Sequence, residues 1–75
     1  MSFELKPNHE LVAIAAAGGG FTLRAGLKPT HEIVQIAAAA ANGGARITFT
    51  GMAMRPQHEL VQIASAGRGN IILEE

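Results

Sequence analysis

The chain has 75 residues, six basic and six acidic side chains, and no cysteine. This length fits one domain, and a chain of roughly this size buries only about 60 % of its unfolded surface on folding. The composition excludes disulfides and thiolate metal sites, and the zero net charge excludes a strongly basic nucleic-acid-binding domain. We therefore expect one small domain, residues 1–75, whose lack of net charge favours association.

No apolar run approaches the roughly 20 residues of a membrane span, and the longest alanine run covers only residues 37–41. The sequence MSFELKPNHE lacks the basic region and long apolar core of a signal peptide. We expect no membrane partner and a cytoplasmic location.

One motif occurs three times: a basic residue, a proline, a polar residue, histidine and glutamate. Its prolines are Pro7, Pro29 and Pro56, which are 22 and 27 residues apart. An apolar helical pattern, glycines and a strand-like run follow each copy. Units of this kind stack because one alone cannot bury its apolar face. The pattern predicts three helix–strand repeats, at about residues 6–27, 28–54 and 55–75, after a short N-terminal strand.

In chain order, the first expected element is the strand at residues 2–5. The first helix should have Pro7 in its first turn, where the missing N–H of proline costs nothing, and Pro29 and Pro56 should occupy the same place in the other two helices. Leu11, Ile14 and Ala15 have the i, i+3, i+4 spacing of a helix, and the other two units repeat it. Glycines after each pattern predict C-terminal stops, and the second helix should be about one turn longer.

Between the helices, residues 21–27 and 46–54 alternate apolar and polar side chains, as strands with one covered face do. A shift of phase near Gly51 predicts a bulge in the second of these runs. Residues 70–75 form the last short strand. The apolar residues before each basic–proline pair, Leu5, Leu27 and Met54, should pack against the helix starts.

These elements predict a small two-layer α/β repeat of βαβαβαβ order. Right-handed crossovers give a four-stranded, mainly parallel sheet with three helices on one face. An alternative keeps the elements but changes the strand order, or exchanges elements between two chains. The other face of the sheet is open, and Glu4–Arg24 and Arg46–Glu74 are the expected ion pairs on it.

The candidate binding residues are on this open face: Thr22, Arg24, Arg46, Thr48 and Thr50. We predict a non-catalytic interaction or structural module that acts through self-association, as a homodimer, or through contacts with another protein. The alternative is nucleic-acid or anionic-ligand binding through the same arginines and threonines. The absence of Trp and Tyr disfavours nucleic acid, since single strands bind by stacking on aromatic side chains.

His9, His31 and His58 occupy equivalent places and could form a metal site or a row of general bases. Neighbouring helices lie about 8–10 Å apart, whereas zinc holds each ligand nitrogen at about 2.1 Å, so we expect backbone or glutamate contacts instead. The glycine runs follow helices, whereas phosphate loops precede them. No serine–histidine or paired-carboxylate arrangement is present, and we predict no metal, no cofactor and no enzyme activity.

The stretch VAIAAAGGG, residues 12–20, resembles the first helix and glycine turn of transcription-activator-like effector repeats, which read DNA bases from that turn. That family has two helices in each repeat, whereas this chain has a helix and a strand. The expected architecture is similar to leucine-rich-type α/β solenoids, without their asparagine-bearing consensus. Neither resemblance assigns a residue role, and the repetition is compatible with a designed consensus sequence as well as with a natural one.

Overall fold

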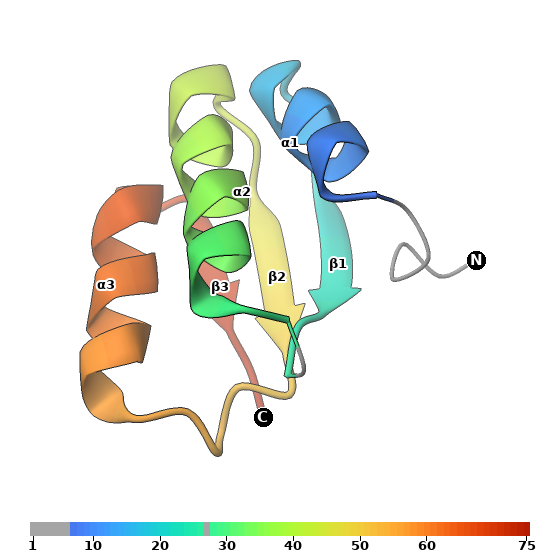
Figure 1. The fold of residues 1–75 in the computed structure, drawn as a ribbon. Coiled ribbons are helices and arrows are strands. Elements are labelled where there is room, and N and C mark those ends of the chain that lie inside the picture. Colours follow the sequence, from blue (N-terminus) through green and yellow to red (C-terminus); the bar gives the residue numbers. More distant parts are fainter. Residues whose placement is uncertain (1–6, 27) are drawn as a thin grey trace.

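The computed structural model describes residues 7–26 and 28–75 and has an α/β fold. Helices and strands alternate along it: α1 (Asn8–Ala16), β1 (Phe21–Arg24), α2 (Thr30–Gly43), β2 (Ile47–Thr50), α3 (Gln57–Gly67) and β3 (Ile71–Leu73). The strands form a parallel sheet in the order β1-β2-β3. The helices lie side by side in a second layer that covers one face of this sheet (Figure 1).

The predicted four-stranded sheet is wrong, because the described residues form three strands. The expected strand at residues 2–5 lies outside the described part of the chain. The other strands are shorter than predicted. In β2 the reason is visible: Gly51, directly after the strand, has a φ of 75° and turns the backbone. The α/β class is confirmed.

Each helix starts one residue later than the sequence predicts. Pro7, Pro29 and Pro56 have extended backbone angles and act as the N-cap residues of α1, α2 and α3. Their carbonyl oxygens accept the first helical hydrogen bonds, as N-cap carbonyls do. The longer second helix is confirmed, with 14 residues against 9 in α1 and 11 in α3.

The core lies between the helix layer and the sheet. Along β2, Ile47 and Phe49 are fully buried, while Thr48 and Thr50 alternate with them on the other face. The large side chains that are fully buried come from all three helices, from β1 and β2, and from the loop after β2: Leu11, Leu23, Ile33, Ile36, Ile47, Phe49, Met52 and Ile63. Burial of one strand face against amphipathic helices is what the period-2 and period-3.6 patterns predict.

The α1–α2 contact depends on a small residue. A Cβ atom at Gly43 would overlap the carbonyl oxygens of Ala15 and Ala16. At the other end of the same contact, Asn8 Nδ2 donates a hydrogen bond to Gln35 Oε1 at 3.0 Å. The two helices are therefore held together by a backbone approach at one end and a polar contact at the other.

Candidate interaction surfaces

The open face of the sheet brings the predicted binding residues together. Parallel pairing places Thr22 beside Thr48 and Arg24 beside Thr50. Arg46 directly precedes β2 and is exposed. These five residues, Thr22, Arg24, Arg46, Thr48 and Thr50, therefore share one surface, and their role in binding stays a prediction.

The expected Arg46–Glu74 ion pair is wrong, because the register separates the two residues. Ile47 pairs with Ile71 and Phe49 with Leu73, so Arg46 is level with Asn70 at the opposite end of β3 from Glu74. The other expected pair includes Glu4, which lies outside the described residues.

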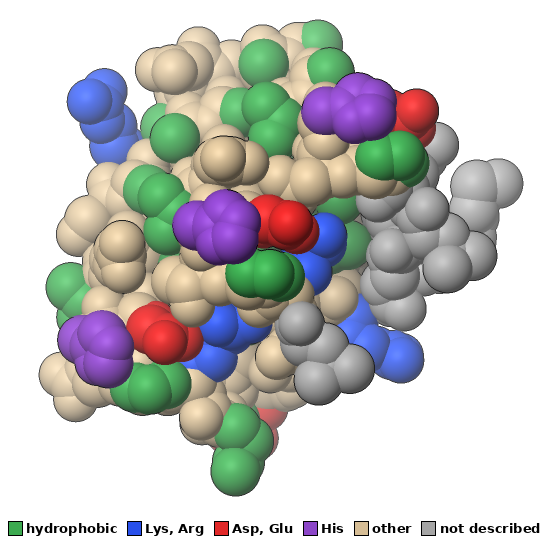
Figure 2. Space-filling model, in the orientation of Figure 1, with side chains coloured by type: hydrophobic (Ala, Val, Ile, Leu, Met, Phe, Trp, Pro, Cys, Tyr) green, Lys and Arg blue, Asp and Glu red, His purple; other side chains and the backbone are tan. Residues whose placement is uncertain are grey.

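The three histidines form a row across the starts of the helices. His9, His31 and His58 are all exposed, and each has a glutamate beside it (Figure 2). Within residues 7–26 and 28–75, no three His, Cys, Asp or Glu side chains lie close enough together to hold a metal ion. The row is therefore an exposed polar edge, with no chemistry assigned to it.

The basic residue of the repeated motif has a role that the sequence analysis missed. Arg55 Nη2 donates hydrogen bonds to the carbonyl oxygens of Ala25, at 2.9 Å, and of Lys28. Its Nη1 donates to Thr30 Oγ1 at 2.9 Å and to Glu59 Oε1 at 3.2 Å. Arg55 therefore ties the start of the third repeat to the loop between β1 and α2.

An ion pair equivalent to Arg55–Glu59 occurs one repeat earlier, where Lys28 Nζ lies 3.4 Å from Glu32 Oε1. Both pairs have i, i+4 spacing across the motif proline, and the sequence repeats that spacing at Lys6 and Glu10. The signal was therefore present in the sequence: a basic residue stands four positions before the motif glutamate in every copy. Only the structure shows that Arg55 also reaches the preceding repeat.

The last repeat leaves apolar surface uncovered. We call this surface the open end: the outward side of α3, the outer edge of β3 and the pocket between them. Val61 on α3 is 55 % exposed, whereas its equivalents Val12 and Val34 pack against the core. The pocket has a volume of about 130 Å³ and is lined by Met52, Ala53, Leu60, Leu73, Glu74 and Glu75.

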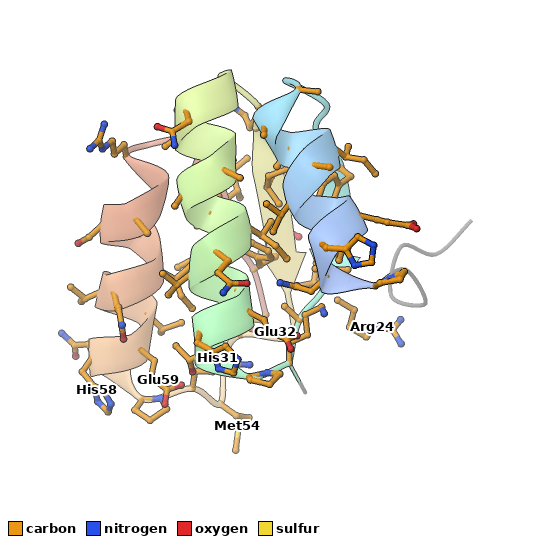
Figure 3. The ribbon with its side chains drawn as sticks, turned by 45° about the horizontal axis from the view of Figure 1, so that its top comes forward. Arg24, His31, Glu32, Met54, His58 and Glu59 are labelled. Carbon is orange, nitrogen blue, oxygen red and sulfur yellow. The ribbon has the colours of Figure 1, made fainter. Side chains whose placement is uncertain are left out.

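Met54 lies on the loop before α3, and its side chain does not cover the open end. The side chain was expected to pack against the start of α3, yet it is 95 % exposed. Figure 3 shows it pointing away from the helix, on the loop that leads to His58 and Glu59. The contact expected from Leu27 lies outside the described residues. Met54 is therefore an exposed apolar side chain on the loop before α3.

Comparison of the chain with protein-family models, with curated proteins and with solved structures found no match. In the described residues, no helix has the length and apolar character needed to cross a membrane.

Proposed function

We propose that the protein is a non-catalytic interaction module that binds another polypeptide at the open end, and that a second copy of the chain is the first partner to test. The supporting observation is that Val61 is 55 % exposed, whereas the equivalent Val12 and Val34 pack against the core. Apolar side chains that a stacked repeat would normally cover provide free energy for association when a partner covers them instead.

The charge of the chain supports the same proposal. Six basic and six acidic side chains leave no net charge, so copies do not repel one another over long distances. The outer edge of β3 is also a place where a further strand can pair, since β3 is the last strand in the order of the described sheet.

Light scattering from micromolar to millimolar protein concentration tests the proposal. We expect a rise in mean mass with concentration, and we expect Val61→Lys to abolish it by placing a charge on the contact surface. Gln62→Lys is the matched control, because Gln62 is also exposed on α3 and already polar. A mass that stays monomeric in the wild-type chain would remove self-association, and a mass unaffected by Val61→Lys would remove the open end as its site.

A further inference from the structure

The pocket at the open end has the size of a site for one side chain. Sites for small-molecule ligands usually have volumes of about 300–1,000 Å³. The volume here is about 130 Å³, and the pocket is open to solvent. Its apolar wall is formed by side chains of α3, of β3 and of the loop that follows β2: Met52, Ala53, Leu60 and Leu73. These residues fit a single apolar side chain.

The backbone next to the pocket is suited to pairing with an extended segment. Ile47 N–H donates to the Asn70 carbonyl at 3.0 Å, and Glu74 N–H donates to the Phe49 carbonyl at 2.8 Å. Asn70 and Glu74, the residues on either side of β3, therefore direct these peptide groups toward β2. Successive residues of a strand alternate in direction, so the N–H and C=O groups of Ile71 and Leu73 point to the outer edge.

The charge at this edge defines the partner further. Glu74 and Glu75 are exposed and line the pocket. The side-chain ion pairs found among the described residues join Lys28 to Glu32 and Arg55 to Glu59, so neither includes these two carboxylates. An approaching segment therefore meets an apolar pocket beside two negative charges, and a lysine or arginine there is the complementary choice.

We infer that the outer edge of β3 binds an extended segment of a partner protein as an added strand, with one apolar side chain in the pocket and a lysine or arginine beside Glu74 and Glu75. In this mode, main-chain hydrogen bonds provide affinity and the pockets for alternate side chains provide specificity. The inference rests on the proposed function, because it assigns a partner chemistry to the same open end.

The probe is a synthetic peptide in which valine alternates with threonine and two lysines follow. It is titrated into the full ¹⁵N-labelled chain. We expect the amide signals of Ile71 and Leu73 to shift more than those of Thr22, at the far side of the sheet. A peptide with two glutamates in place of the lysines should bind about tenfold more weakly, which corresponds to about 1.4 kcal/mol. A peptide with serine in place of valine should lose binding.

The double variant Glu74→Gln, Glu75→Gln should remove the preference for the lysine peptide, while Glu10→Gln at the other end of the helix layer should keep it. Equal binding of the lysine and glutamate peptides to the wild-type chain would overturn the inference. So would signal shifts confined to Thr22 and Thr48, or no shift at millimolar peptide.

Light scattering on the same sample separates this inference from the proposed function. If the chain associates with itself through Val61 and the lysine peptide neither binds nor competes, then the partner chemistry is wrong and the proposed function survives. If the peptide binds at β3 to a chain that stays monomeric, then the inference holds and self-association is wrong. If neither occurs, then both are wrong.

Discussion

The middle repeat and the last repeat have similar sequences but differ in burial. Ala37 and Phe49, in α2 and β2, are fully buried, whereas the equivalent Ala64 is exposed and Leu73 is only half-buried. The side chains are all apolar, so the difference does not come from their hydrophobicity. It comes from position, because the middle repeat has a neighbour on each side and the last repeat has one (Figure 1). In a stacked repeat protein, neighbour contacts decide how much each unit contributes to stability.

The largest expected effect compares the two strands at equivalent inward positions. Phe49→Ala should lower the free energy of unfolding by about 3–5 kcal/mol, because it leaves a cavity in a closed core. Leu73→Ala should cost about 1–2 kcal/mol, since that side chain is only half-buried. Urea unfolding followed by circular dichroism measures both. If Phe49→Ala fails to fold, Phe49→Leu provides a smaller change at the same site. Equal losses at the two positions would show that the last repeat is covered as fully as the middle one.

The second comparison concerns the basic residues of the same two repeats. Arg55→Met should cost about 1.5–3 kcal/mol, because it removes charged hydrogen bonds to the Ala25 and Lys28 carbonyls and to Thr30. Lys28→Met should cost only about 0–1 kcal/mol, since its contact is a single i, i+4 ion pair at 3.4 Å.

Arg55→Lys tests whether the shape of the side chain matters in addition to its charge. A lysine keeps the positive charge but lacks the planar donors that let Nη1 and Nη2 reach two sides at once. We expect it to recover less than half of the loss in a urea titration. Full recovery would mean that charge alone stabilises this junction between repeats.

The difference between the two repeats also marks how far the sequence could predict the structure. The i, i+3, i+4 spacing and the period-2 alternation predicted the three helices and the inward faces of the described strands, because both patterns are local. The predicted strands were too long at their C-terminal ends. Residues 25–27 continue the alternation, and residues 51–54 resume it after the shift of phase near Gly51, but β1 and β2 end at Arg24 and Thr50. A local pattern does not show where a partner strand stops.

The candidate surfaces show the same limit. The alternation alone was enough to group the threonines and arginines of the open sheet face. The open end was not predictable in this way, since Val61 has nearly the same local sequence as Val34 and yet is exposed on the last helix. The Arg46–Glu74 pair failed for a related reason, because cross-strand pairing depends on a register that two separate strands set together.

A third prediction uses glycines near the C-terminal ends of the two helices. Gly43→Ala should cost about 1–3 kcal/mol, because its methyl group meets the backbone carbonyls of Ala15 and Ala16, which cannot move without separating α1 from α2. Gly67→Ala should cost a similar amount. Gly67 is buried, and its methyl group would overlap the Cγ1 atom of Ile71, at the near end of a β-branched side chain that has little freedom to rotate. Thermal unfolding of both variants measures the losses, and a loss below about 0.5 kcal/mol at Gly67 alone would show that the end repeat yields to an added methyl group where the middle one does not.

The smallest effect is expected at the valines that first distinguish the two helices. Val→Thr keeps the branched shape and replaces one methyl group with a hydroxyl. The change in the free energy of unfolding therefore depends on how far water is excluded from each site. Val34→Thr should lower the free energy of unfolding by about 1 kcal/mol, because Val34 packs against the core. Val61→Thr should change it by less than about 0.5 kcal/mol at protein concentrations where the chain is monomeric, because Val61 is 55 % exposed there.

At concentrations where the chain associates, Val61→Thr should become destabilising as well, since a partner that covers this side chain adds the neighbour that the last repeat lacks. Unfolding curves recorded at two concentrations therefore decide the matter: a Val61→Thr effect that does not grow with concentration would mean that association leaves this valine in water.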